Sequence, residues 1–156
     1  MLILIFHIGS SLYAIDSYHV IEVIPRVTYR EVAYVPKYVA GLFNYRGAIV
    51  PVIDLCQLLR GTPSKPYLST RVIMVSYPGK DNRLQYIGLM AERVIKTMNK
   101  PEIEFVNSGI QADQAAYLGG MMMDEKGMIQ RIDIDRLFAE LKPVKFLGVG
   151  NDSSSN

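Results

Sequence analysis

The sequence is poor in the residues that build disulfide, zinc and catalytic sites. Cys56 is the only cysteine among 156 residues, which excludes a disulfide scaffold. It stands between Leu55 and Leu58, so we interpret it as a small buried apolar side chain. His7 and His19 are the only histidines, and neither has a second ligand at metal-binding spacing. We therefore predict no metal site and no bound cofactor.

The motifs of common enzyme classes are also missing. The sequence contains no G-x-S-x-G nucleophile motif and neither of the glycine-rich motifs that bind nucleotide phosphates. Asp133 and Asp135 could form a catalytic pair, but a helix cap and a surface charge near the helix start explain them more simply. No catalytic constellation remains, and we predict that the protein is not an enzyme.

Long apolar runs and targeting signals are absent too. No run approaches the length that spans a bilayer. The apolar start, residues 1–8, carries no basic segment, because the first Lys or Arg is Arg26, and no cleavage site of small residues follows it. We therefore expect a cytoplasmic protein without direct membrane insertion. Residues 148–156 are rich in Gly, Asn, Asp and Ser and predict a disordered tail after a single domain of residues 1–147.

The sequence does contain enough apolar surface for a folded core. Hydrophobic residues make up 49% and charged residues 21% of the chain, which suits one ordinary domain or two very small ones. Residues 1–100 hold 12 Lys and Arg against 6 Asp and Glu, whereas residues 101–156 hold 5 against 9, so the net charge of +2 divides into +6 and −4. This division favours contacts with unlike protein surfaces, although scatter over solvated faces explains it equally well.

Short strands separated by Gly and Pro turns dominate the pattern. Pro51 lies within one predicted strand and indicates an edge or a bulge, because proline cannot donate to the ladder. We also expect a short helical turn after Pro36, a linker at residues 61–66 and a loop with a short helix at 99–116. Strands are predicted at residues 2–6, 12–16, 19–24, 48–53, 71–76, 85–90, 93–98, 121–123 and 128–132, with short helices capped by Asp54 and Asp133.

Two segments of the chain resemble each other. Residues 49–59 read IVPVIDLCQLL and residues 128–138 read MIQRIDIDRLF, aligned without gaps at an offset of 79 residues. Both predict a strand, an aspartate cap and a short helix. A strand followed by a capped helix is common, but the match suggests two related β units that share a core, and short strands of this kind are typical of small barrels.

The densest segment is Gly41–Gly47, with the sequence GLFNYRG. Two glycines within seven residues imply a backbone that turns sharply or approaches another group closely. Arg46 needs a carboxylate or carbonyl partner if it is partly buried, and Glu22, in an otherwise apolar strand, has the matching need. A Glu22–Arg46 ion pair satisfies both, while exposure of each side chain to solvent is the simpler alternative.

These residues resemble the CheW-like family of bacterial chemosensory coupling proteins. The resemblance rests on LYAIDSYHVIEVIP (residues 12–25), on VPKYVAGLFNYRGAIVPVIDL (35–55) and on GGMMMDEKGMIQRIDIDRLF (119–138). It implies a mainly β fold of two intertwined five-stranded SH3-like β-barrels with short helices. It also implies a non-catalytic adaptor that joins the cytoplasmic tips of chemoreceptors to the regulatory domain of a CheA-type histidine kinase, as a monomer in solution that forms rings in arrays.

The resemblance also implies a partner-binding site, in a groove that the family places between its barrels. The family's Glu–Arg pair falls on Glu22 and Arg46, and the glycine and asparagine of its G-x-x-N-x-R-G motif fall on Gly41 and Asn44. Apolar positions near the groove match Val20, Val50 and Val52, for which a core role is an equal explanation. Kinase contacts are carried over only as regions of the two barrels. The receptor-binding set is therefore Val20, Glu22, Gly41, Phe43, Asn44, Arg46, Gly47 and Val50.

Three alternatives remain. A small nucleic-acid-binding barrel would use the interleaved Arg26, Tyr29, Arg30, Tyr34, Lys37 and Tyr38, although the cluster is short and the low net charge favours no nucleic-acid partner. A regulatory domain derived from a CheA kinase or a CheW–receiver fusion is the second. An enzyme with a small-molecule pocket is the third, but no residue stands out as nucleophile or base.

Overall fold

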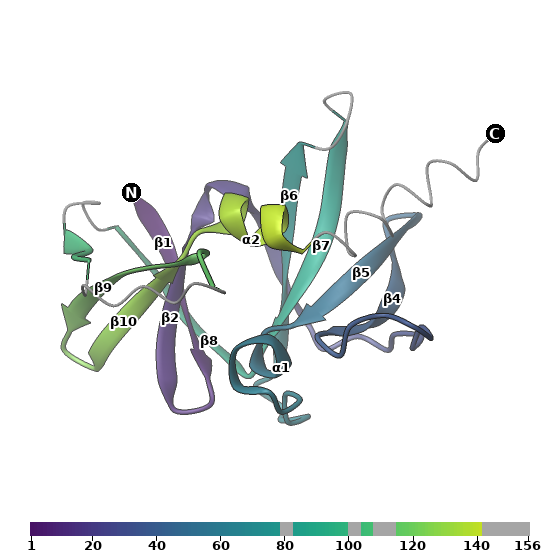
Figure 1. The fold of residues 1–156 in the computed structure, drawn as a ribbon, viewed down its shortest axis with the longest axis horizontal. Helices are drawn as coiled ribbons and strands as arrows, with labels where there is room; N and C mark the ends of the chain where they lie inside the picture. Colours follow the sequence, from purple (N-terminus) through teal and green to yellow (C-terminus); the bar gives the residue numbers. More distant parts are fainter. Residues whose placement is uncertain (79–82, 100–103, 108–114, 142–156) are drawn as a thin grey trace.

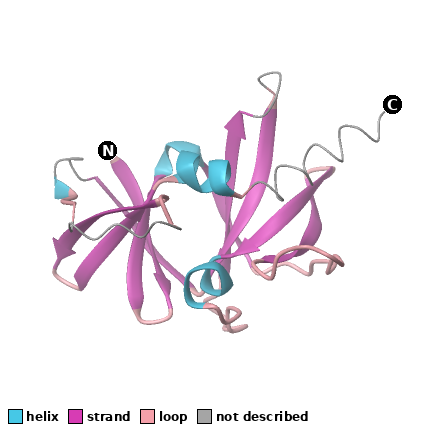
Figure 2. Cartoon of the chain, in the orientation of Figure 1, coloured by secondary structure: helices cyan, strands magenta, loops and turns pink. Residues whose placement is uncertain are grey.

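The computed structural model describes residues 1–78, 83–99, 104–107 and 115–141. These residues form two five-stranded sheets that stand side by side, with one short helix at each end of the junction between them (Figures 1 and 2). The first sheet contains, in spatial order, β8 (Arg93–Asn99), β1 (Leu2–Ile8), β2 (Ser11–Asp16), β10 (Gly127–Ile132) and β9 (Leu118–Asp124). The second contains β3 (Val20–Pro25), β6 (Arg71–Pro78), β7 (Leu84–Ala91), β5 (Ala48–Asp54) and β4 (Val39–Tyr45). The helices are η1 (Ser17–His19), α1 (Leu55–Arg60) and α2 (Ile134–Glu140).

The two sheets exchange strands. Hairpin β1–β2 lies in the first sheet, but β3, which follows it, pairs with β6 in the second. Hairpin β6–β7 lies in the second sheet, but β8, which follows it, pairs with β1 in the first. The two spatial orders therefore correspond position by position. Because neither sheet is built from one continuous half of the chain, the predicted intertwined arrangement is confirmed.

The internal similarity at an offset of 79 residues corresponds to equivalent parts of the two sheets. β5 leads into α1 and pairs in parallel with β7, while β10 leads into α2 and pairs in parallel with β2. Both predicted aspartate caps are confirmed: Asp54 accepts hydrogen bonds from the backbone N–H of Cys56 and Gln57, and Asp133 accepts one from Arg136. The aligned sequences therefore encode the same strand–cap–helix unit twice.

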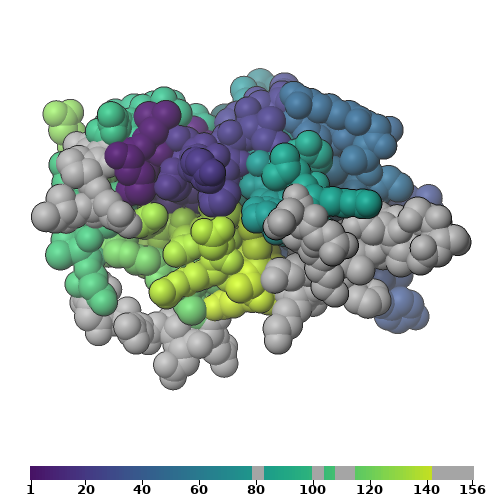
Figure 3. All heavy atoms as spheres, turned by 90° about the horizontal axis from the view of Figure 1, so that it is seen from above, coloured from purple at the N-terminus to yellow at the C-terminus, as the bar shows by residue number. Residues whose placement is uncertain are grey.

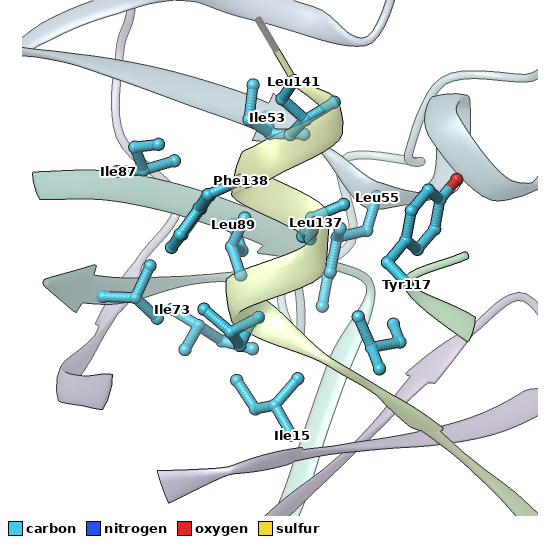
Figure 4. Packing of buried hydrophobic residues seen from close by; sticks show 14 of the residues in the cluster. Ile15, Ile53, Leu55, Ile73, Ile87, Leu89, Tyr117, Leu137, Phe138 and Leu141 are labelled. Atoms are coloured by element: carbon cyan, nitrogen blue, oxygen red, sulfur yellow. The ribbon is translucent and has the colours of Figure 1, made fainter. Parts of the chain in front are cut away.

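A shared hydrophobic core joins the two sheets. Leu137, Phe138 and Leu141, on or just after α2, belong to one buried cluster with residues of the second sheet. Figure 4 shows Leu141 beside Ile53 and Phe138 beside Leu89. Phe138 also packs on Tyr77, with ring centroids 4.3 Å apart. Each buried side chain of this size contributes about 1.5–3 kcal/mol through removal from water. Helix α2, which follows the last strand of the first sheet, therefore covers the core of the second sheet. Figure 3 shows α2 in the middle of one face of the molecule, with atoms of both sheets around it.

Each sheet also has a smaller core of its own. Buried residues that belong only to the first sheet are Ile3, Ile5, Leu12, Ala14, Met122 and Ile129. Those of the second sheet are Tyr45, Val50, Val52, Val72, Met74 and Met90. Cys56 is buried in the shared core, at 3% exposure, as its sequence position predicts. The molecule thus has one central core flanked by two lateral ones.

The region around Pro36 differs from the sequence-based prediction. Pro36 begins one hydrogen-bonded turn, in which the N–H of Val39 donates to the Pro36 carbonyl oxygen over 3.0 Å. No helix forms there, and strand β4 begins directly at Val39. The sequence analysis assigned no strand to residues 39–45, because Gly41 and Asn44 interrupt the pattern. Pro51 pairs with Leu42 of β4, and the ladder from β5 to β7 begins one residue later at Val52. The proline therefore lies at the end of a ladder, as its missing N–H requires.

The structure also bears on the predicted linker at residues 61–66 and the predicted loop at residues 99–116. Residues 61–66 are no loose linker: the N–H and hydroxyl of Ser64 donate to Asp54, and the N–H of Lys65 donates to Glu92. The predicted loop at 99–116 lies partly outside the described residues, and the predicted tail at 148–156 lies wholly outside them. Among the described residues, no helix is long and apolar enough to cross a membrane.

Candidate functional site

The predicted Glu22–Arg46 ion pair is present in the structure. Glu22 lies on β3 and Arg46 lies in the turn between β4 and β5, on the same sheet. Arg46 Nη2 donates to Glu22 Oε2 over 2.5 Å. The side chains remain 62% and 37% exposed, so the pair adds little net stability but leaves polar groups available at the surface.

Tyr45 is the third member of this network, and the sequence analysis did not predict its role. Its hydroxyl donates to the same Glu22 Oε2 over 2.5 Å, and the Arg46 guanidinium carbon lies 5.1 Å from its ring centroid. The ring is buried at 6% exposure and packs edge-on against Tyr86. Burial and the hydrogen bond to Glu22 raise the pKa of Tyr45 to about 12, although Arg46 acts in the opposite direction. Tyr45 thus anchors the exposed ion pair to the lateral core of the second sheet.

A tight hairpin turn places Arg46 at the end of β4. Arg46 and Gly47 have φ values of 51° and 84°, the two positive values that a two-residue type I′ hairpin requires. Asn44 Oδ1 accepts a hydrogen bond from the N–H of Gly47 over 2.9 Å. The predicted sharp turn is therefore real, and Asn44 and Gly47 act by shaping it.

Gly41 serves the other predicted purpose, close approach. A Cβ atom at this position would lie 2.4 Å from the carbonyl oxygen of Arg30 and 2.8 Å from the Tyr29 ring. Arg30 and Leu42 exchange backbone hydrogen bonds of 2.8 and 2.9 Å directly beside it. Any side chain at Gly41 would therefore push the segment around Arg30 away from β4.

The predicted apolar site residues do not share one environment. Val50 is 2% exposed and lies in the lateral core of the second sheet, where the half-buried Phe43 packs against it. Val52 is fully buried in the same core. Val20, at the start of β3, is half-buried against the shared central core instead. Val50 and Val52 are thus core residues, while Phe43 and Val20 are partly accessible.

A groove of about 530 Å³ lies beside β4 and β5, next to the turn. It is lined by residues 30–33, by residues 42–44 and by Ile49, which is 58% exposed. Phe43 and Asn44 belong both to this groove and to the predicted site. No residue of the first sheet lines it, so it is not the groove between the barrels that the resemblance implies. It was not predicted, because the exposure of Ile49 depends on the unpredicted strand β4.

The interleaved basic and aromatic segment offers little to nucleic acid. Tyr29 and Tyr38 are half-buried, and Tyr38 packs against the shared core. Tyr34 alone of the three tyrosines in this segment is fully exposed. Stacking platforms for single strands need several exposed rings in a row, so this alternative gains no support from the structure.

The site offers charged and apolar surface. Within residues 1–78, 83–99, 104–107 and 115–141, no group of three or more His, Cys, Asp or Glu could hold a metal ion. Met122 points inward at 3% exposure and Met123 outward at 69%, so this strand alternates, and Met123 pairs across the ladder with the exposed Met128 of β10. The accessible features are an ion pair on a rigid turn and an apolar groove beside it.

An intertwined pair of five-stranded sheets with short helices at their junction defines the class of fold to which the chain belongs. Residues 2–142 match the model of the CheW-like domain. Because this match covers nearly the whole sequence, the chain belongs to the CheW-like domain family.

Similarity to individual proteins supports this family assignment. The probable chemotaxis protein CheW of Rhizobium etli is 28% identical over 137 residues, which is 86% of this chain and 85% of the relative. The chemotaxis protein CheW of Bacillus subtilis is 28% identical over 130 residues, or 83% of this chain and 81% of the relative. The crystal structure of the scaffolding protein TtCheW from Thermoanaerobacter tengcongensis matches with a TM-score of 0.74 and 25% identity, covering 85% of this chain and 84% of that one. The expected fold of two SH3-like barrels is confirmed.

Proposed function

We propose that this protein is a non-catalytic adaptor that couples chemoreceptor signalling tips to a CheA-type histidine kinase. Its relatives are named chemotaxis proteins, and a structural neighbour is described as a scaffolding protein. The observation that carries the proposal is the Glu22–Tyr45–Arg46 network, which fixes a charged turn at the surface.

The receptor tip binds at this turn as an amphipathic helix. A helix of this kind places apolar side chains against a groove and polar ones at its rim. The half-buried Phe43 and exposed Ile49 supply apolar surface, and the Glu22–Arg46 pair supplies a polar rim. Gly41 and Gly47 keep the strand and the turn in the shape that presents these groups.

The kinase binds elsewhere on the two barrels, and the adaptor acts in the cytoplasm, associated with membrane receptors through its partners. Each contact alone is weak, and an array gains strength from many simultaneous contacts. The chain is therefore a monomer in solution and joins rings only with its partners.

Co-sedimentation with receptor tips tests the proposed receptor site. Arg46→Glu places two carboxylates together and should reduce receptor binding at least tenfold. The double variant Glu22→Arg/Arg46→Glu restores an opposite-charge pair and should recover part of the binding. Lys96→Glu is the matched control, because it reverses an exposed charge on β8 of the other sheet. Unchanged receptor binding by folded Arg46→Glu would show that the site lies elsewhere.

A further inference from the structure

A second pocket, of about 460 Å³, lies where the two sheets meet beside α1. In Figure 1, α1 stands at the opposite end of the junction from α2. The walls come from the end of β1 and the β1–β2 turn, from α1 with the loop after it, and from the β7–β8 crossover. The pocket shares no lining residue with the Glu22–Tyr45–Arg46 network. The proposed receptor site therefore does not explain it.

Positive charge dominates the lining of this pocket. Arg60, Lys65 and Arg93 contribute three cations, and Glu92 contributes one carboxylate. All three cationic residues are exposed. None of them forms an ion pair with a carboxylate within the part of the chain that the structure describes. The charges converge on one concave surface, where a ligand would meet them together.

Glu92 only partly offsets the positive charge of the pocket, because each of its carboxylate oxygens already accepts a backbone hydrogen bond. Its side chain is buried, Oε1 accepts the N–H of Gly9 over 2.8 Å, and Oε2 accepts the N–H of Lys65 over 3.0 Å. These bonds fasten the β1–β2 turn and the loop after α1 to the crossover between the sheets. Glu92 thus builds the pocket, and backbone amides meet much of its charge.

The arginines are positioned by the fold. A Cβ atom on Gly9 would lie 1.5 Å from Arg60 Nη1, so the guanidinium rests against the backbone of the β1–β2 turn. Arg93 pairs with His7 in the ladder between β8 and β1. Burial first, and then the charges of Arg93 and Lys126, lower the pKa of His7, which is consistent with a positive potential here.

We propose that this pocket binds a small phosphorylated molecule, with its phosphate held by Arg60, Lys65 and Arg93. Guanidinium groups bind phosphate oxygens through two parallel hydrogen bonds, and an ammonium group adds a point charge. The volume exceeds that of free phosphate and falls in the range of small-molecule sites. Tyr67, 50% exposed at the pocket wall, provides a ring surface for the organic part.

Calorimetric titration of the full chain with three probes tests this proposal: inorganic phosphate, adenosine monophosphate and adenosine. Both phosphate-containing probes should bind, and adenosine should not bind at the same concentration. Tighter binding of the nucleotide identifies an organic phosphate as the ligand class, whereas equal binding identifies free phosphate. Affinity should fall as sodium chloride is raised, because salt screens the exposed charges.

Variants locate the binding. Arg60→Gln and Arg93→Gln each remove one exposed cation and should weaken nucleotide binding about tenfold, the loss of roughly one charge-assisted contact. Lys96→Gln, on the same strand as Arg93 but outside the lining, should leave affinity within about twofold under the same screening. Amide NMR shifts of Gly9 and Lys65 on titration give a second readout in the wild-type chain. Absence of binding by both phosphate probes, equal binding of adenosine, or binding unaffected by either arginine variant would overturn the proposal.

Discussion

At the scale of single residues, one carboxylate oxygen organises the proposed receptor site. Glu22 Oε2 accepts from a buried tyrosine and from an exposed arginine at once. The tyrosine is fixed by packing in the lateral core, and the arginine is fixed by the turn. The surface charge pattern at the turn therefore depends on groups that lie inside the second sheet.

Alkaline titration tests the environment of Tyr45. Its pKa is raised to about 12 in the folded state from the ordinary value of 10.0. Because the folded state holds this proton more tightly, the contribution to stability is complete below pH 10 and is lost as the pH rises through about 12. Tyr45→Phe should reduce the fall in unfolding free energy over this window. Chemical denaturation at several pH values measures it, and identical pH dependence in both proteins would contradict the assignment.

Glu92 is the residue that we expect to matter most at the β7–β8 crossover. Glu92→Ala removes the acceptor of two backbone N–H groups, those of Gly9 and Lys65. Leaving partly buried donors unsatisfied costs about 1–3 kcal/mol each, so the unfolding free energy should fall by about 2–6 kcal/mol. Glu92→Gln keeps one acceptor oxygen and should cost less. Urea denaturation gives both values, and equal effects of the two variants would argue against these hydrogen bonds.

At the scale of elements, the predictions from sequence succeeded where a pattern was local. The strand–aspartate–helix units were predicted because an apolar strand and an aspartate cap come together in both, at Asp54 and at Asp133. The first helix also ends at a glycine, Gly61. The Glu22–Arg46 pair was predicted because each charge needs a partner. Strand β4 was missed because Gly41 and Asn44 are poor strand residues whose places depend on the Arg30 backbone and on the turn. Tertiary contacts of this kind leave no periodic signal in the sequence.

Tyr45 was missed for a related reason. Gly41, Phe43 and Tyr45 alternate along the chain, and this alternation would have predicted an inward-facing set had β4 been recognised. The pocket beside α1 has no sequence signal of its own, because Gly9, Arg60 and Arg93 meet only when the two sheets exchange strands.

Gly41→Ala tests the close approach at β4. The added methyl group would lie 2.4 Å from the Arg30 carbonyl oxygen, so the backbone must move and the Arg30–Leu42 hydrogen bonds must lengthen. Overpacking of this kind costs about 1–3 kcal/mol of unfolding free energy. Gly119→Ala is the control, because its nearest contact would be 3.4 Å. A thermal unfolding midpoint for Gly41→Ala equal to that of the control would contradict the tight contact.

At the scale of the whole molecule, the exchange of strands makes two small barrels into one folding unit. β3 follows the hairpin of the first sheet but pairs in the second, and β8 follows the hairpin of the second sheet but pairs in the first. Helix α2 covers the core between the sheets. The length of the chain suits either one ordinary domain or two very small ones, and the structure combines the two: it has two small barrels within one domain. We expect the two halves to depend on each other for stability.

Calorimetry tests this dependence. Unfolding should be one two-state transition, in which the calorimetric and van't Hoff enthalpies agree. Phe138→Ala should lower the free energy of unfolding by about 3–5 kcal/mol, the cost of truncating a buried aromatic residue. The protein should still unfold in a single transition at a lower temperature. Two resolved transitions would show that the barrels fold separately. So would a loss of amide protection, measured by hydrogen exchange, that is confined to one sheet.

The central claim is that this chain transmits receptor state to the kinase through the turn at Arg46. The most direct measurement is autophosphorylation of a CheA-type kinase reconstituted with receptor tips and this protein. We predict that the wild-type chain makes kinase activity depend on the receptor, that Arg46→Glu abolishes this dependence, and that Glu22→Arg/Arg46→Glu restores part of it. Full receptor-dependent activity with correctly folded Arg46→Glu would contradict the account.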